Sequence, residues 1–205
     1  MSLPAALEQL PPTNEAGEWF RHVALRYKNQ ALGGVARYGR WSTDGGFSVL
    51  YLGRPRDSVV VEAYRHIVDP VDFDNDMDRE KFISALVPRV VVACAVDVSN
   101  LIDLRTPLGR AQAGLVPEDL RSATNDTEAY ARCQHVAQVA HQLRRHGIIA
   151  PAATGLGETL VLFTDILPTA ELPTRSGPDE TWVSWPSDPR LPSSRRHLRV
   201  ADDPA

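Results

Sequence analysis

The apolar residues of this chain come in short runs of strand length, separated by segments in which they recur at helical spacing. Residues 89–96 are dense in β-branched side chains, and residues 47–52 are largely apolar, so both are predicted to be strands. In residues 128–146 the apolar side chains form one stripe, which indicates an amphipathic helix. Short strands mixed with helices predict an α+β fold, in which mixed small sheets are flanked by helices.

Turn residues mark where the first of these elements end. Gly53-Arg54-Pro55 breaks the strand at 47–52, after which Asp57 or Ser58 can cap a helix that extends to Val68. The acidic run from Asp69 to Glu80 is expected to form a solvated loop.

The second half of the chain adds a further pair of elements. Gly147 stands where a C-terminal cap would end the helix at 128–146. Two apolar runs, at 148–150 and 158–163, surround a loop with glycines and predict a hairpin or two adjacent strands.

A length of 205 residues suits one well-cored domain. The proline-containing residues 1–18 are predicted to form an N-terminal arm, and packing is expected to begin at Trp19-Phe20. Residues 19–167 are predicted to form the domain. Residues 168–205 form a proline-rich tail, ordered in part at most, whose Trp182, Trp185 and Arg195-Arg196 could dock onto another chain.

Composition excludes several classes of function. A net charge of −4 argues against direct binding of nucleic acid or of an anionic membrane surface. No run of about 20 apolar residues is present, and the N-terminus lacks the features of a secretory signal, so a cytoplasmic protein is expected. Cys94 and Cys133 lie far apart in apolar segments and are interpreted as buried thiols, not as zinc ligands.

Common catalytic and binding motifs are missing from the sequence. Gly155-Leu156-Gly157 is only a fragment of a phosphate-binding loop, and neither a P-loop lysine nor a full dinucleotide fingerprint occurs. No serine occupies a nucleophile elbow. His135, His141 and His146 do not share one helical face, so no metal site is expected there.

The densest polar set lies in the N-terminal third. Arginine binds phosphate oxygens through two donors at once, so Arg21 and Arg40 suit a diphosphate. The Tyr51 ring can stack on a flat heterocycle, and the Glu62 carboxylate can stabilise an oxocarbenium-like transition state. Each residue also has an ordinary explanation, since arginines are usually solvated, Tyr51 could pack in the core and Glu62 could face outward.

The chain resembles the RES domain, a family named for arginine, glutamate and serine. The resemblance covers about residues 19–167 and rests on the order of five motifs: Phe20-Arg21, Gly39-Arg40-Trp41, Val49-Leu50-Tyr51-Leu52, Glu62 and Gly147-Ile148-Ile149-Ala150-Pro151. It implies a fold similar to ADP-ribosyltransferases, NAD⁺ as the substrate without a metal, and an enzyme that cleaves the nicotinamide–ribose bond as a glycohydrolase, phosphorylase or ADP-ribosyltransferase. It further implies that the protein is a toxin, which an Xre-like antitoxin would bind and block. A homodimer of the protein is a further possibility.

The resemblance also assigns roles to single residues. Arg21 and Arg40 would hold the phosphates, Tyr51 would face the nicotinamide or its ribose, Glu62 would support cleavage, and His22 would line the same pocket.

At one position the chain departs from the family pattern. Pro151-Ala152-Ala153 lacks the serine that the family usually carries after its proline, and Thr154 could substitute for it. The alternative function is therefore a catalytically impaired module of the same fold that binds a ligand or a partner.

Overall fold

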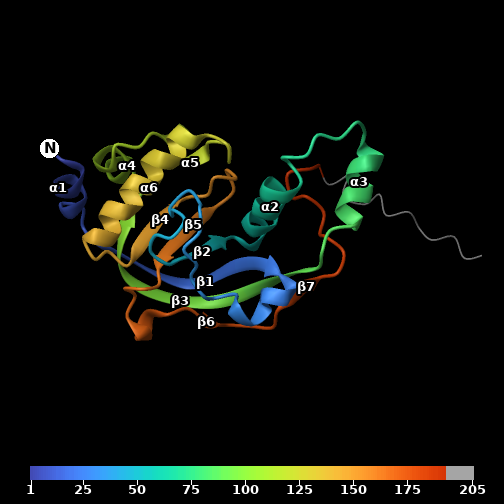
Figure 1. Ribbon diagram of the computed structural model, residues 1–205. Coiled ribbons are helices and arrows are strands. Elements are labelled where there is room, and N and C mark those ends of the chain that lie inside the picture. The colour runs from blue at the N-terminus through green and yellow to red at the C-terminus, as the bar shows by residue number, and fades with distance from the viewer. Residues whose placement is uncertain (193–205) are drawn as a thin grey trace, which may run out of the picture.

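Two long antiparallel strands, β1 (Thr13–Ala24) and β3 (Arg89–Asp103), run side by side along the molecule (Figure 1). The computed structural model describes residues 1–192. Between Val92 and Val98 every second side chain of β3 is buried, because alternate residues of a strand face the same side. β3 therefore supplies one apolar face to the core along most of its length.

Three shorter strands join β1 and β3 in the sheet. β2 (Val49–Arg54) pairs with β5 (Glu158–Phe163), β5 pairs with β4 (Gly147–Pro151), and β4 lies parallel to the end of β3. β1 pairs with both β2 and β3, so the pairings return to their starting strand and the five strands form a closed ring. The ring encloses an apolar cluster that includes Trp19, Leu50, Leu52, Leu101, Ile149, Leu160 and Leu162.

One group of helices lies on the side of the ring where the N-terminus of the chain is found (Figure 1). The longest is α6 (Thr127–Gln142), which begins where the Asp126 side chain accepts a hydrogen bond from the Ala129 amide. Its buried stripe packs against β4 and β5. The short helices of this group are α1 (Leu3–Glu8), α4 (Pro107–Ala113) and α5 (Pro117–Arg121).

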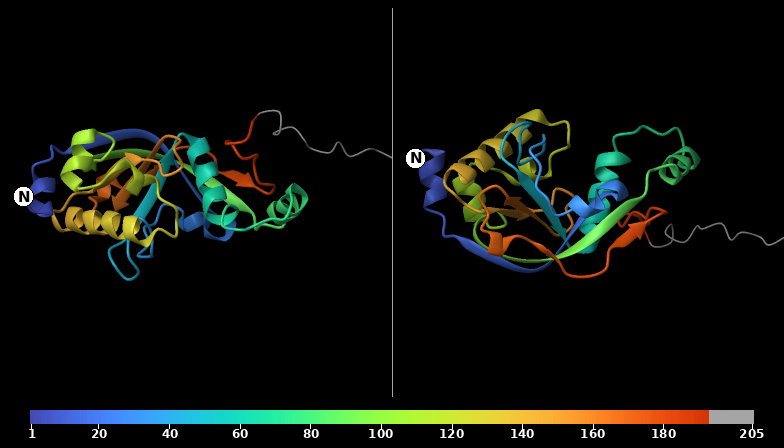
Figure 2. Two further views of the ribbon diagram at one scale, coloured as in Figure 1. Left: turned by 90° about the horizontal axis from the view of Figure 1, so that it is seen from above. Right: turned by 60° about the horizontal axis from the view of Figure 1, so that its bottom comes forward.

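A second group lies at the opposite end, as the two views of Figure 2 also show. It contains α2 (Arg56–Ile67) and α3 (Asp76–Ser84). The C-terminal strands β6 (Thr174–Arg175) and β7 (Glu180–Trp182) pair with β3. The 3₁₀ helices are η1 (Leu25–Gln30) and η2 (Thr169–Glu171). Within residues 1–192, no helix combines the length and the apolar character needed to cross a membrane.

The α+β prediction is confirmed, and most elements lie where the sequence pattern placed them. The hairpin predicted around residues 148–163 is the β4–β5 pair. Cys94 and Cys133 are free and buried, as expected. Burial raises the pKa of the Cys94 thiol to about 12, so this group stays protonated near neutral pH.

Several element boundaries were predicted wrongly. The strand predicted at 47–52 is not broken at Gly53, because β2 stays paired through Arg54, and α2 begins at Arg56 with Pro55, not Asp57 or Ser58, at its N-cap. The helix at 128–146 ends at Gln142, the left-handed backbone is taken by Arg144, and Gly147 begins β4. Gly147 is needed for another reason, since a Cβ there would lie 2.1 Å from the Val161 carbonyl oxygen on the paired strand. The acidic run at 69–80 is not all loop, because Asn75 caps α3 and acidic side chains suit the first turn of a helix.

The structure also differs from the expected arm and tail. Residues 1–18 include α1 and the first half of β1, and residues from 168 onward include two strands that pair with β3. Trp182 and Trp185 do not face outward; they pack against α2 beside Tyr64. Arg195-Arg196 lies outside the described residues.

Candidate active site

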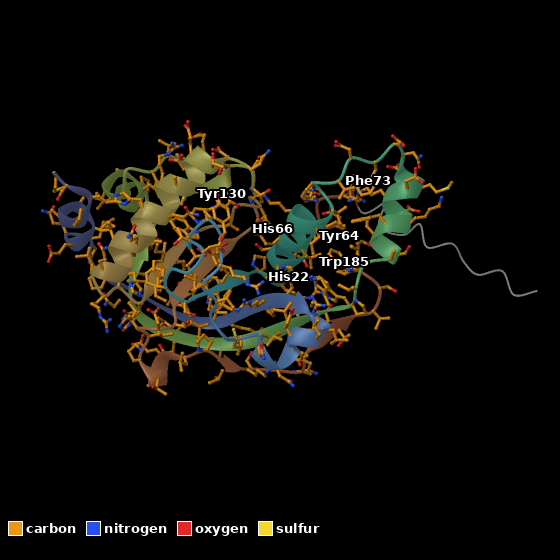
Figure 3. All side chains as sticks on the ribbon, in the orientation of Figure 1. His22, Tyr64, His66, Phe73, Tyr130 and Trp185 are labelled. Atoms are coloured by element: carbon orange, nitrogen blue, oxygen red, sulfur yellow. The ribbon has the colours of Figure 1, made fainter. Side chains whose placement is uncertain are left out.

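A cavity of about 290 Å³ lies where β1, β2 and α2 face the turn at residues 38–41 and α6. This volume is near the lower end of the range for small-molecule sites, roughly 300–1,000 Å³. Figure 3 shows His22, His66 and Tyr130 on the side of α2 that faces α6, and Tyr64, Phe73 and Trp185 on its other side. The charged and aromatic side chains that line the cavity are Phe20, Arg21, His22, Tyr38, Arg40, Trp41, Tyr51, Glu62, Arg65, His66 and Tyr130.

Five of the six residues proposed from the sequence, Arg21, His22, Arg40, Tyr51 and Glu62, line this one cavity. They come from β1, the turn at 38–41, β2 and α2, which the closed ring brings together. Their chemical roles stay predictions, because lining a cavity does not establish what a side chain does there.

Glu62 is the only acidic side chain among the described residues that line the cavity. Its Oε1 lies 2.6 Å from Nε2 of His66, one helical turn further along α2. Burial raises the pKa of Glu62, but the hydrogen bond and charge of His66, with the charges of Arg65 and Arg40, outweigh burial and hold the pKa below its usual value. The carboxylate is therefore ionised near neutral pH.

His22 lines the cavity and is held there as a neutral ring. Nε of Arg89 donates a hydrogen bond of 2.9 Å to Nδ1 of His22, and the ring stacks on Trp182 at 6.3 Å between centroids. Burial, and then the charges of Arg89, His66 and Arg21, keep the pKa of His22 well below its ordinary 6.5. Because Nδ1 accepts, the proton of the neutral ring is on Nε2.

The Tyr51 hydroxyl holds the turn at residues 38–41 in place. It accepts a hydrogen bond of 3.0 Å from the Trp41 amide and lies 3.0 Å from the Ser42 hydroxyl. Gly39 is required here, since a Cβ would lie 2.8 Å from the Tyr51 hydroxyl. Burial raises the pKa of Tyr51 to about 12, so the phenol stays protonated.

Arg40 is 8% exposed and is largely engaged with the protein itself. Its guanidinium donates to the carbonyl oxygen of Asp119, to the Ser122 hydroxyl at 2.8 Å and to the Ser122 carbonyl oxygen at 2.7 Å, and it lies over the Tyr130 ring at 4.5 Å. Arg40 thus ties the turn at 38–41 to the end of α5 and to α6. Arg40 lines the cavity, but both of its terminal nitrogens already donate to the protein, which limits its ability to bind a phosphate through two hydrogen bonds at once.

Arg21 and Arg65 make fewer contacts with the protein. Arg21 donates through Nη1 to the Gly33 carbonyl oxygen at 2.9 Å. Arg65 donates through Nη2 to the carbonyl oxygens of Ser122 and, at 3.4 Å, Arg121. Two guanidinium groups therefore meet at the Ser122 carbonyl, because Arg40 also donates to it. Adjacent cations are favoured by an anion bound between them.

Thr154, the sixth residue proposed from the sequence, is not among the residues that line the cavity. The reason is geometric, since it belongs to the turn between β4 and β5, where its hydroxyl contacts Leu156. Ala152 is 2% exposed and likewise does not line the cavity. Ser58 does line the cavity, and its hydroxyl oxygen lies 3.4 Å from the hydroxyl oxygen of Thr154.

Sequence reasoning did not single out Arg65, His66 and Tyr130, three charged or aromatic residues that line the cavity. Two of them carried a signal, because residues three and four positions after Glu62 share its face of a helix. Tyr130 looked like part of the apolar stripe of α6, and Tyr38 stacks on it at 5.8 Å.

The described part of the chain holds no group of three or more His, Cys, Asp or Glu side chains arranged for a metal ion. Two of the histidines of the late segment lie in separate pairs, His141 with Asp165 and His146 with Glu171.

Comparison with known proteins identifies the family. None of the curated proteins matches the chain in sequence. The crystal structure of the M. tuberculosis MbcT–MbcA toxin–antitoxin complex contains a chain of similar fold, with a TM-score of 0.71, 22% identity, and coverage of 87% of this chain and 91% of that chain. The family model of the RES domain matches residues 12–185, a span that includes the whole strand ring and every residue lining the cavity. The chain belongs to the RES-domain family.

Proposed function

We propose that this protein binds NAD⁺ and cleaves the bond between nicotinamide and ribose. The observation that carries the proposal is one ionised carboxylate, Glu62, set among cationic and aromatic side chains in one cavity. The arrangement offers separate contacts to the diphosphate, to the ribose at the bond that breaks and to the nicotinamide ring.

The cations suit the diphosphate. Arg21, Arg40 and Arg65 line the cavity. Guanidinium groups bind phosphate oxygens with well-directed hydrogen bonds. Because Arg40 is engaged with Ser122, we assign the direct phosphate contacts to Arg21 and Arg65, and to Arg40 mainly a charge contribution.

The carboxylate suits the bond that breaks. When the bond from the nicotinamide nitrogen to ribose C1′ breaks, its electron pair leaves with nicotinamide and positive charge develops on the ribose. A carboxylate close to that charge, or bonded to a ribose hydroxyl, lowers the barrier. Addition of water, phosphate or a protein side chain to C1′, with release of the acceptor's proton, completes the reaction. We assign the carboxylate to Glu62 and the wall facing nicotinamide to the Tyr51 ring.

We also propose that the protein is the toxin of a toxin–antitoxin pair. The related fold in the MbcT–MbcA toxin–antitoxin complex supports this proposal, together with the RES-domain family match. The partner would be an Xre-like antitoxin that covers the cavity and excludes NAD⁺.

Incubation of the purified protein with NAD⁺, followed by chromatography, tests the activity directly. We expect the unmutated protein to release nicotinamide, and Glu62→Gln, which keeps the size but removes the charge, to slow release at least 100-fold. Glu128→Gln is the matched control, because its parent side chain is 88% exposed and lies outside the cavity. Absence of nicotinamide from the unmutated protein would contradict the proposal.

The second candidate is a module that binds the same ligand without turning it over. The observation that favours it is Ala152, which stands where the family usually carries serine. This candidate predicts that ADP-ribose binds, that no nicotinamide is released, and that cells expressing the protein grow normally. Calorimetry with ADP-ribose, combined with the release assay, separates the two functions.

A further inference from the structure

We propose that His66 is a positioning residue, which holds one oxygen of the Glu62 carboxylate so that the other oxygen faces the ligand. The inference rests on the proposed function, since it gives His66 a part in that reaction. It concerns a side chain to which neither sequence motifs nor the family comparison assigns a role.

The contact itself is short and local. Nε2 of His66 and Oε1 of Glu62 lie 2.6 Å apart, from positions four residues apart on α2. His66 stands in the last turn of the helix, where the exposed carbonyl groups favour a side chain that donates or carries positive charge. The two side chains are 46% and 37% exposed, so the pair stands at the cavity wall and stays accessible to a ligand.

Without this contact, other groups would compete for the carboxylate. A glutamate side chain has three rotatable bonds, and Arg65 and Arg40 both attract its charge. At present both guanidinium groups donate to the Ser122 carbonyl oxygen instead. A carboxylate released from His66 could turn toward these cations, where its oxygens would be paired with donors of the protein. The ionised oxygen would then no longer be directed at the ribose.

The hydrogen bond from His66 therefore fixes the orientation of the Glu62 carboxylate and also favours its ionised form. Catalytic groups act only when they are held close to the productive geometry, and a supporting hydrogen bond is the usual way to hold them. Losing such a contact should lower kcat, with a smaller effect on KM, because the binding cations remain in place.

Two substitutions at His66 test this with NAD⁺ as the probe. We expect His66→Ala to lower kcat about 10-fold to 100-fold, with KM for NAD⁺ changed less than about 3-fold. Glutamine carries an amide nitrogen close to the position of Nε2, so His66→Gln should recover most of the lost kcat. The matched control is His141→Ala, which removes a similar histidine–carboxylate pair, 2.8 Å from Asp165, outside the cavity.

A second measurement does not depend on activity. NMR titration of the Glu62 carboxyl group should show its pKa rising in His66→Ala, because the hydrogen bond and charge of His66 lower that pKa in the intact protein. Thermal unfolding of each variant shows whether the fold is intact.

The outcomes separate the two proposals. A wild-type protein that releases no nicotinamide refutes the proposed function, whereas an unchanged Glu62 pKa in His66→Ala refutes the contact. Equal kcat in the wild type and in His66→Ala would overturn the positioning role. So would an equal loss of kcat in the alanine and glutamine variants, since orientation by a donor would then not be what matters.

Discussion

His22 shows how a single half-buried side chain can make the stability of the protein depend on pH. Its Nδ1 accepts from Arg89, its ring stacks on Trp182, and it lines the cavity. Protonation would place a charge beside Arg89 and Arg21, so the folded protein resists it. The unfolded chain has no such restriction and takes up a proton at the ordinary histidine pKa.

A pH dependence of stability follows from this difference. The contribution of His22 is complete above pH 6.5, the ordinary histidine pKa, and is lost as the pH falls below it, because the unfolded state then binds the extra proton. Between pH 6.5 and 5 we expect the free energy of unfolding to fall by at most about 1.4 kcal/mol per pH unit from this group. Urea unfolding at several pH values measures the slope.

The control for this prediction is His22→Asn, whose amide oxygen can accept the Arg89 hydrogen bond but cannot be protonated. The variant should lose less stability than the wild type over the same pH range. Identical slopes for the two proteins would show that the pKa of His22 is the same in the folded and unfolded states, contrary to this prediction.

At the residue scale the sequence indicated most of the cavity but not how its side chains are engaged. Residue type alone suggested Arg21, Arg40, Tyr51 and Glu62, and all four line the cavity. The bonds of Arg40 to Asp119 and Ser122 span 79 and 82 positions of the chain, which no local pattern reveals. Arg65 and His66 could have been found, because helical spacing from Glu62 points to both.

At the scale of elements, the C-terminal segment, residues 180–186, packs against α2 on the side opposite to Glu62. β7 pairs with the start of β3, Arg56 in the first turn of α2 pairs with Glu180, and the Tyr64 hydroxyl donates to the Pro186 carbonyl oxygen at 2.8 Å. Trp182, 2% exposed, and Trp185 pack against the same helix. The helix that carries Glu62 and His66 thus depends on residues more than 100 positions later.

Substitution within this segment should therefore destabilise the protein. We expect Trp182→Ala to lower the free energy of unfolding by about 3–5 kcal/mol, since it leaves a large cavity in the core. The neighbouring Val183 is 77% exposed, and Val183→Ala should change stability by less than about 0.5 kcal/mol. Equilibrium denaturation of both variants is the measurement. Similar values for the two would mean that this segment is not part of the stable fold.

Sequence patterns located the longer elements better than the short ones. The stripe of α6 and the β-branched run of β3 are strong signals, and both elements are present, although α6 ends earlier, at Gln142, and β3 continues further, to Asp103. β6 and β7 span 2 and 3 residues, too few for alternation to be recognised, and they form only because the edge of β3 offers free hydrogen-bonding groups. Their pairing is a tertiary effect.

At the scale of the whole molecule, the cavity is assembled from segments between Phe20 and Thr159. A ligand in it contacts several elements at once and binds only the folded state. ADP-ribose at about 100 times its Kd should raise the free energy of unfolding by about 2.7 kcal/mol. For a chain of this size, that corresponds to a rise in Tm of roughly 5–10 °C. Differential scanning calorimetry measures it.

The control variant for this measurement is Arg21→Ala, which removes a cation from the cavity while leaving the strand pairing of β1 intact. Its Tm should respond less to ADP-ribose at the same concentration. A wild-type Tm that does not move with millimolar ADP-ribose would contradict binding of this ligand class.

The closed strand ring has a consequence for how the protein is made. β1 cannot complete its pairing with β3 until Leu101 has been synthesised, and β2 cannot complete its pairing with β5 until Phe163 has been synthesised. The ring is therefore still open when most of the chain has left the ribosome, and we expect unfinished polypeptides to carry no assembled site. Translation itself would then delay the onset of activity until β5 has been made.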